Sequence, residues 1–386
     1  MNAAAKLADA ILGKREVAEG STQPAVSSPG TMKAIVWEGP KRVACVDKPI
    51  PVVTHEKDVI VMVTACSVCS GSDSHLYSGE IPTMDEGCIL GHEACGVIAE
   101  VGSDVKRLKK GDRAEFVRVP FGEVNCFRIP DDVPDDRALF VSDVLSTSLH
   151  AVEIGEVTVG DSVVIWGLGP IGLYAAAWCK LKGARRVLGI DKVAERLELA
   201  HDKFGIEVLD RGDLSSSQVV SKVSGLFPRD EGVDVVIDAT GFRFSETLTS
   251  KLERAVGLET DTPDILNECV SVVRSFGRVS VIADYVGYAN HFPLGHIVMK
   301  HLTLRSGQCP VQKYFDVVMK ALQQQQIDPT LMVTHRLTLD QAPKAYEELF
   351  YKASGYVKVL ITPGGVLDKN EEGKRGEDAV ATCAQP

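Results

Sequence analysis

The strongest constraint on the fold of this chain is a change of rhythm near Asp161, where strand-like and helix-like segments begin to alternate. The β-branched run VVIWG is followed by the apolar segment IGLYAAAWCKLKG, and the same pair recurs as VLGID followed by AERLELAHDKFG. The strand-like segments VDVVIDATG and GRVSVIADYVG continue the pattern. Because parallel strands need long crossover connections, this alternation predicts βαβ units in a doubly wound parallel sheet.

A glycine-rich sequence lies at the first strand-to-helix junction. Gly167, Gly169 and Gly172 spell G-x-G-x-x-G, with Pro170 and Ile171 between the last two glycines. In this context the first glycine allows a tight turn, and the second lets a pyrophosphate approach the main chain. The third lets helix and strand pack closely, so the sequence predicts a dinucleotide-binding loop.

Asp191 ends the next strand-like segment, nineteen residues after the last of these glycines. A carboxylate at this place accepts hydrogen bonds from the adenosine ribose and repels a 2′-phosphate. The sequence therefore predicts NAD rather than NADP as the cofactor. The alternative is a glycine-rich turn followed by a capping aspartate, with no nucleotide.

Composition limits the classes of partner. The 386 residues are 45% hydrophobic and 25% charged, which is typical of a soluble globular chain of about two domains. The formal net charge of −11 opposes binding to nucleic acid or to an anionic membrane, both of which need a cationic face. No segment resembles a membrane span or a cleavable leader. The ten cysteines show no paired spacing, so we expect reduced thiols, a cytoplasmic protein and small-molecule partners.

The first half of the chain has a different pattern. Over residues 32–152, short β-rich runs such as KAIVW and DVIVMVTA are separated by Gly, Pro and Asp, which predicts an irregular barrel-like domain. We place the nucleotide-binding domain at 153–308 and expect 309–362 to return to the first domain. Residues 1–31 and 363–386 are polar or rich in Gly, Ser and Pro, and we expect both to be mobile extensions.

A second motif lies before the strand-like run GVIAEV. The run GHE contains His92 and Glu93, with Cys69 upstream and Asp143 downstream. In this order, and followed by the glycine fingerprint, these residues resemble the zinc-dependent medium-chain alcohol dehydrogenase family. The resemblance spans nearly all of residues 32–362. It implies an α/β protein with a GroES-like barrel catalytic domain and a doubly wound parallel-sheet Rossmann domain.

The resemblance also implies a catalytic zinc ion bound by Cys69, His92 and Asp143. Three protein ligands leave a fourth position open for water or substrate. Glu93 would lie behind the ion and approach it during ligand exchange, or tune it from there. From spacing alone, Asp143 would be interpreted as a carboxylate at a helix N-terminus and His92 as an ordinary histidine.

The loop after Cys69 departs from the family pattern. The family's loop reads Cys-Gly-Ser-Asp-x-His, whereas Ser70 stands here between Cys69 and Gly71. If the strand keeps its register, Cys69 is the ligand and Ser70 bulges out; if the loop keeps its register, Ser70 takes the ligand position and zinc is weakened or lost. We favour Cys69, because a one-residue bulge is common beside active sites. Cys66 and Cys69 also spell C-x-x-C, but a separate zinc site or disulfide is disfavoured without a second pair.

Further roles follow from the resemblance alone. Ser72 would take the proton of an alcohol, and His75 would pass it through the nicotinamide ribose to water. Arg196 and Lys358 occupy positions where basic residues of the family contact the adenosine ribose and the pyrophosphate, with a solvated surface role as the alternative. Thr147 matches a threonine that packs on nicotinamide.

Two segments, 254–268 and 307–314, resemble insertions of the formaldehyde dehydrogenase-like branch of this family. That branch carries a lobe whose clustered cysteines bind a structural zinc ion. Here Arg113 runs directly into Ala114, and the lobe is absent. We therefore expect one catalytic zinc ion and no structural zinc. We also expect a homo-oligomer, although the missing lobe leaves its size and the substrate open.

The leading interpretation is a zinc- and NAD-dependent oxidoreductase that transfers a hydride between a small alcohol or hydrated aldehyde and NAD. One alternative is an NAD-binding protein with a decayed zinc site and a regulatory role. Another is a zinc-free reductase of the same superfamily, which the presence of all three ligand residues disfavours.

Overall fold

The chain forms two compact units in the computed structural model. One unit runs up to Leu139 and resumes at Val333, and the other is Phe140–Met332. The structure describes residues 30–79, 84–114, 118–227, 232–241, 262–285, 289–351 and 355–363. The expected mobile extensions lie outside the described residues, except for positions 30, 31 and 363.

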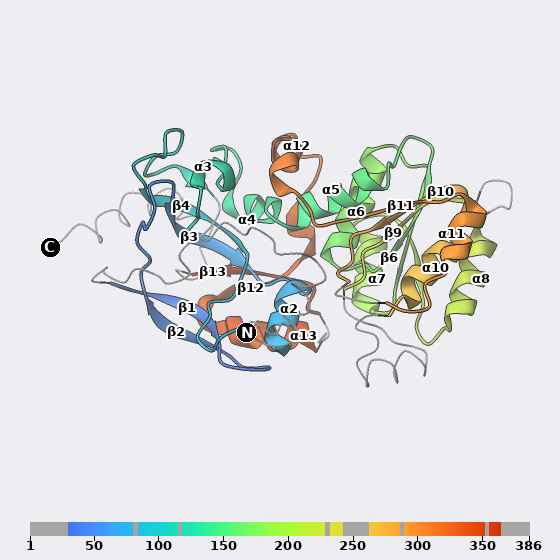
Figure 1. Ribbon diagram of the computed structural model, residues 1–386, viewed down its shortest axis with the longest axis horizontal. Coiled ribbons are helices and arrows are strands. Elements are labelled where there is room, and N and C mark those ends of the chain that lie inside the picture. The colour runs from blue at the N-terminus through green and yellow to red at the C-terminus, as the bar shows by residue number, and fades with distance from the viewer. Residues whose placement is uncertain are drawn as a thin grey trace. The chain divides into compact units, whose positions relative to one another are not determined.

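The unit Phe140–Met332 is built on a six-stranded parallel sheet (Figure 1). Across the sheet the strands are β11 (Thr303–Ser306), β10 (Val273–Val281), β9 (Val233–Asp238), β6 (Ser162–Trp166), β7 (Arg186–Asp191) and β8 (Glu207–Asp210). Each neighbouring pair is parallel. Counted from β8, this is the 3-2-1-4-5-6 order of a doubly wound nucleotide-binding sheet, and the order reverses between β6 and β9. The predicted parallel sheet is confirmed.

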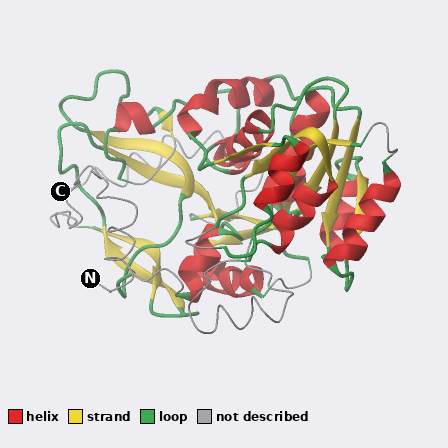
Figure 2. Cartoon of the chain, turned by 45° about the vertical axis from the view of Figure 1, so that its right-hand side comes forward, coloured by secondary structure: helices red, strands yellow, loops and turns green. Residues whose placement is uncertain are grey.

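Helices cover both faces of this sheet (Figure 2). The helices of this unit are α5 (Val144–Ile154), α6 (Pro170–Leu181), α7 (Ala194–Asp202), α8 (Ser216–Leu226), α10 (Asp264–Val272), α11 (Leu294–Lys300) and α12 (Val311–Gln323), with short 3₁₀ turns η1 (Leu139–Val141) and η2 (Pro329–Met332). Every residue of β6 is buried, because both faces of the strand are covered. Val164 and Trp166 join a core cluster with Val223 of α8 and Cys269 of α10.

The boundaries of this unit differ from the expected 153–308. Helix α5 packs on α6 and α12, so it belongs to this unit. Trp178 donates its indole N–H to the carbonyl of Leu145 at 3.1 Å. At the other end, the hydroxyl of Tyr174 donates to the carbonyl of Asp328 at 2.7 Å, and the unit extends to Met332. Contacts between helices, which the strand pattern does not reveal, move both boundaries.

The other unit contains two smaller sheets. β1 (Thr31–Trp37) and β2 (Val43–Pro49) form an antiparallel pair. The five-stranded sheet has the order β12 (Val333–Thr338), β13 (Lys358–Thr362), β3 (Val59–Ser67), β4 (Glu93–Val101) and β5 (Arg113–Ala114). The helices are α2 (Ser72–Ser78), α3 (Gly122–Asn125), α4 (Asp135–Ala138) and α13 (Ala342–Phe350), with the 3₁₀ turn η3 (Leu339–Gln341). Because β13 pairs with β3, the C-terminal segment completes this unit.

Strand pairing places the GHE motif beside the end of β3. β3 and β4 are antiparallel, with Ser67 opposite Glu93. The loop that follows β3 carries Cys69, and His92 directly precedes β4, so the two residues lie at the same end of the sheet. On the other side of β3, the hydroxyl of Ser67 donates to the carbonyl of Val359 in β13 at 2.7 Å.

Among the described residues, no helix is both long enough and apolar enough to span a bilayer.

Candidate metal centre and dinucleotide site

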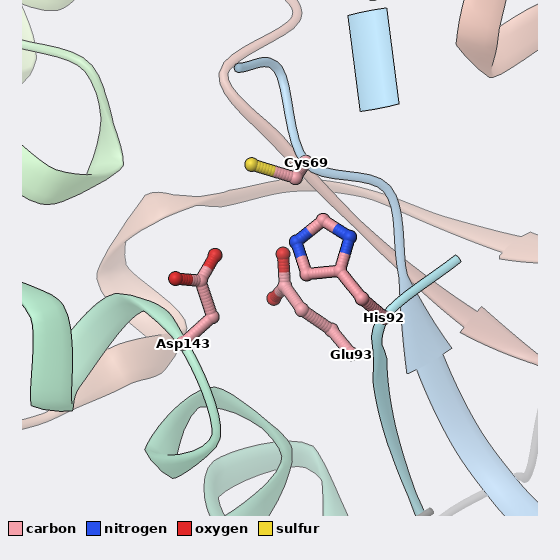
Figure 3. A group of neighbouring side chains, drawn as sticks. All are labelled: Cys69, His92, Glu93 and Asp143. Atoms are coloured by element: carbon pink, nitrogen blue, oxygen red, sulfur yellow. The ribbon is translucent and has the colours of Figure 1, made fainter. Parts of the chain in front are cut away.

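Four side chains with metal-binding groups point toward one another (Figure 3). One ligand atom each from Cys69, His92, Glu93 and Asp143 lies within 4.8 Å of the other three. Glu93 is buried, Cys69 and Asp143 are half-buried, and His92 is exposed. A thiolate, an imidazole and carboxylates are the groups that zinc prefers in proteins. The structure therefore brings together the three predicted ligands and Glu93, and their donor set fits a zinc ion.

The extra residue in the loop does not displace Cys69 from this group. The backbone carbonyl of Ser70 accepts a hydrogen bond from the hydroxyl of Ser74 at 3.1 Å, so Ser70 is part of the turn that leads into α2. Cys66 lies outside the group. Burial, followed by the negative charges of Glu93 and Asp73, raises the pKa of the Cys66 thiol to about 12, and it is neutral at physiological pH.

Asp73 contacts the predicted ligands, and the sequence analysis assigned it no role. Its carboxylate is buried and contacts two of the predicted ligands. Nδ1 of His92 donates to Oδ1 of Asp73 at 3.0 Å, and the backbone N–H of Cys69 donates to Oδ2 at 2.9 Å. A carboxylate that holds Nδ1 leaves Nε2 of the imidazole directed to a metal. The signal that could have found it is the aspartate of the family's Cys-Gly-Ser-Asp-x-His loop, which Asp73 matches.

Glu93 and Lys358 form a buried ion pair behind the ligand group. Lys358 Nζ lies 2.5 Å from Oε1 of Glu93, and the two side chains are 1% and 0% exposed. The alternative of a solvated surface role for Lys358 is therefore wrong. Buried charges are stable only when paired in this way. A contact of Lys358 with a pyrophosphate stays a prediction.

The surroundings of the ligand group carry negative charge. Burial raises the pKa of Tyr346 well above its usual range, and the nearby carboxylates of Asp73 and Glu93 are among the groups that raise it further. Negative groups that disfavour a phenolate also favour a bound cation. The electrostatics of this region therefore suit a metal ion.

The two predicted relay residues lie on α2. Ser72 is exposed at the start of the helix, and His75 is buried, with 8% of its surface exposed. Residues three apart are neighbours on a helix surface. The helix thus keeps Ser72 and His75 on one side, and the route of a proton between them stays a prediction.

The glycine loop has the geometry that its sequence predicts. Gly167 has a φ of +87°, and a Cβ there would lie 2.7 Å from the carbonyl oxygen of Ala239. A Cβ on Gly172 would lie 1.8 Å from the carbonyl oxygen of Gly167. The fold therefore requires both glycines. A Cβ on Gly169 would instead face open space, with a single neighbour at 3.8 Å, which leaves room for a pyrophosphate.

Helix α6 starts directly at this loop. Gly169 is its N-cap residue, Pro170 and Ile171 begin its first turn, and no side chain caps its N-terminal amides. Uncapped amides and the helix dipole make such an end a binding site for phosphate. The loop also lies at the ends of β6 and β9, where the strand order reverses and where such sheets bind their ligands.

The predicted ribose site contains a carboxylate and a guanidinium group. Oδ2 of Asp191 accepts a hydrogen bond from the N–H of Leu168 at 2.7 Å, and Oδ1 accepts from Lys192 and Val193 at 2.7 and 3.0 Å. Arg196 Nη1 lies 3.7 Å from Asp191 Oδ2. The buried Nε of Arg196 has no hydrogen-bond partner among the described residues. A buried donor without an acceptor beside a fixed carboxylate fits a hydroxyl-bearing ribose.

Comparisons with known proteins place the chain in a family. Residues 55–137 match the alcohol dehydrogenase GroES-like domain, and residues 170–257 match the zinc-binding dehydrogenase domain. A zinc-type alcohol dehydrogenase-like protein of Schizosaccharomyces pombe is 48% identical, over 93% of this chain and 97% of that protein. The chain belongs to the zinc-dependent medium-chain alcohol dehydrogenase family. It is an oxidoreductase, and the predicted GroES-like and Rossmann folds are confirmed.

Two further relatives align with this enzyme over nearly their whole lengths. The alcohol dehydrogenase TADH of Thermus sp. ATN1 superposes with a TM-score of 0.71 at 30% identity, over 86% of this chain and 99% of that one. A formaldehyde dismutase of Pseudomonas putida is 27% identical over 87% of this chain and 98% of that protein. The alignment with the S. pombe protein runs over 416 positions, more than the 386 residues of this enzyme, so that relative carries segments that this chain lacks.

Proposed function

We propose that the enzyme transfers a hydride between a small alcohol or hydrated aldehyde and NAD, with one zinc ion in each chain. The observation that carries the proposal is the group of Cys69, His92, Glu93 and Asp143, with ligand atoms within 4.8 Å of one another. Among the described residues, no other group of three or more such side chains lies this close together. This group supports the proposed catalytic zinc ion.

In this proposal, Cys69, His92 and Asp143 hold the zinc ion. When bound, zinc supplies a Lewis acid that polarises the substrate oxygen and stabilises its negative charge. Asp73 keeps the imidazole of His92 in the orientation and tautomer that a ligand needs. Lys358 lies against Glu93 and balances the charge of its carboxylate.

Proton movement is assigned to helix α2. Ser72, which is exposed, accepts the proton of the substrate hydroxyl, and His75 carries it onward to water. The exposure of Ser72 and the burial of His75 support this order, because the outer residue is the one that substrate can contact.

The features of the Rossmann unit support NAD as the cofactor. The open space over Gly169 and the uncapped amides of α6 would accommodate the pyrophosphate. Asp191 and the Nε of Arg196 would bind the adenosine ribose. The carboxylate of Asp191 also repels the 2′-phosphate of NADP. Thr147 would pack on nicotinamide.

A small alcohol or a formaldehyde-like hydrated aldehyde is the proposed substrate class. The resemblance to the formaldehyde dehydrogenase-like branch and the similarity to a formaldehyde dismutase support it. Two segments, 254–268 and 307–314, carry the resemblance to that branch. Residues 254–261 of the first segment lie outside the described residues.

We also propose that the enzyme is a cytoplasmic homo-oligomer. All four residues of the edge strand β11 are exposed, and an uncovered edge offers unpaired backbone groups to a second strand. On the neighbouring helix α11, Leu294, Val298 and Met299 are 63%, 65% and 79% exposed, so a second copy would bury apolar surface there. No disulfide joins the described cysteines, which supports a reducing compartment.

The test is the metal content of protein purified without chelator, followed by alcohol-dependent formation of NADH. We expect about one zinc ion per chain. His92→Ala should lose both zinc and turnover and keep NAD binding, while the exposed control His201→Ala should keep all three. Turnover that survives in His92→Ala overturns the mechanism. Folded wild-type protein that binds NAD but holds no metal supports the decayed-site alternative.

A further inference from the structure

The side chain of Asp143 does not act as a helix cap, although its position predicts that role. Asp143 is the N-cap residue of α5, where an aspartate normally accepts a hydrogen bond from a first-turn amide. No side-chain capping hydrogen bond is formed here. The carboxylate is therefore oriented by some other contact.

Thr147 supplies that contact one helical turn later. Its hydroxyl Oγ1 donates to Oδ1 of Asp143 at 3.0 Å. Its backbone N–H donates to the carbonyl of Asp143 at 2.8 Å, which holds the two residues in register. The two side chains are thus joined within a single helix, and their geometry is set locally.

The thiol of Cys309 is a second neighbour of the Thr147 side chain. The donor hydrogen of Thr147 is committed to Asp143, and only the remainder of the side chain can pack against a cofactor.

We propose that Thr147 is a positioning residue for the third metal ligand: its hydroxyl holds Oδ1 of Asp143 and presents Oδ2 to the metal ion. The proposal rests on the proposed function. The terminal torsion of an aspartate is broad and roughly two-fold, so a carboxylate without such a contact exchanges its two oxygens. Thr147 orients Asp143 by a hydrogen bond, just as Asp73 orients His92.

The experiment compares Thr147→Val, which keeps the shape and removes the hydroxyl, with Thr147→Ser, which keeps the hydroxyl. Zinc affinity is measured by competition with a chromophoric chelator, and the visible absorption of the Co²⁺-substituted protein reports ligand geometry. NAD is left out, so that a loss of nicotinamide packing does not contribute. We expect Thr147→Val to bind zinc about 10 to 100 times more weakly, with an altered Co²⁺ spectrum. Thr147→Ser should match the wild type in both.

Ser148→Ala is the matched control. This neighbouring hydroxyl is also on α5, but it donates to the carbonyl of Leu145 and not to Asp143. It should therefore change stability without changing zinc affinity. If Thr147→Val does not fold, Thr147→Ala replaces it, with the same expected loss.

Asp143→Ala separates this proposal from the function on which it rests. If the wild type binds no zinc, or if Asp143→Ala binds it equally well, the proposed ligand set fails. If Asp143→Ala weakens binding while Thr147→Val binds like the wild type, only the role of Thr147 is overturned. Equal losses in Thr147→Val and Thr147→Ser also overturn it, because the hydroxyl is then not the cause.

Discussion

The glycine loop and the metal-ligand group are built in different ways. The loop occupies residues 167–172 and depends on main-chain atoms, since two of its glycines leave no space for a Cβ. The ligand group draws on side chains from 69 to 143, and it is supported by Asp73 and by Lys358, which lies 265 residues from Glu93. A main-chain site can be recognised in a short stretch of sequence. A side-chain site needs partners that orient each ligand, and these partners lie wherever the fold brings them.

The largest expected effect tests the dependence of the ligand group on a distant partner. Lys358→Met removes the ammonium and leaves the carboxylate of Glu93 buried without its counter-ion. The free energy of unfolding should fall by about 3–5 kcal/mol, measured by urea denaturation. Adding Glu93→Gln removes the buried charge and should recover most of the loss. A double variant that is as unstable as Lys358→Met would show that the ion pair is not what supports this region.

The next prediction separates the two kinds of glycine in the loop. In Gly172→Ala, the new methyl would meet the carbonyl oxygen of Gly167 at 1.8 Å. The main chain must move, so we expect a loss of about 1–3 kcal/mol or more, together with loss of NAD binding.

Gly169→Ala is the matched change in the same loop, because its methyl faces open space. Stability should change by less than about 0.5 kcal/mol, whereas NAD affinity, measured by calorimetry, should fall because the methyl occupies the space left for the pyrophosphate. Unchanged NAD affinity in Gly169→Ala would contradict the predicted path of the cofactor.

Asp73→Asn tests whether an orienting carboxylate matters to the metal. The amide cannot replace the charged acceptor for Nδ1 of His92, so zinc affinity should fall by about 10 to 100 times. The measurement is chelator competition without NAD, with Asp47→Asn as an exposed control in the same unit. If Asp73→Asn binds zinc as tightly as the wild type, the orienting carboxylate does not matter to the metal.

The smallest effect concerns a pair of side chains in the Rossmann unit. Nδ1 of His150 lies 2.8 Å from the hydroxyl of Tyr314, which is 164 residues away. Burial, followed by the charge of Lys313, lowers the pKa of His150. The unfolded chain then binds a proton more readily below about pH 6.5. The contribution of neutral His150 to the free energy of unfolding is therefore complete above that pH, and it is lost as the pH falls.

Denaturation at several pH values checks this. The free energy of unfolding should fall less steeply below about pH 6.5 in His150→Gln than in the wild type, with a difference of about 1 kcal/mol or less. His201→Gln, which changes an exposed residue, should keep the pH dependence of the wild type. If His150→Gln keeps the full pH dependence, the buried imidazole is not its source.

The fold class and the nucleotide loop could be predicted because their signals are local. Strand and helix periodicity, three glycines and one acidic residue at the end of β7 are enough to specify a doubly wound sheet with its fingerprint. The ligand set was accessible only through family resemblance, because the spacing of Cys69, His92 and Asp143 says nothing about their distance in space. Asp73 matches the aspartate of the family loop, but the motif alone does not show that its carboxylate contacts His92.

By itself, the sequence determined the parallel sheet, the glycine loop and the residue types available for a metal. The tertiary structure decided that Cys69 and not Ser70 joins the ligand group, and that Lys358 is buried against Glu93. It also decided that Asp143 contacts Thr147 instead of capping its helix. The physical reason is that backbone conformation depends mainly on neighbouring residues. Side-chain pairing across strands depends on register, such as Ser67 opposite Glu93, and a change of one residue in that register alters every pair.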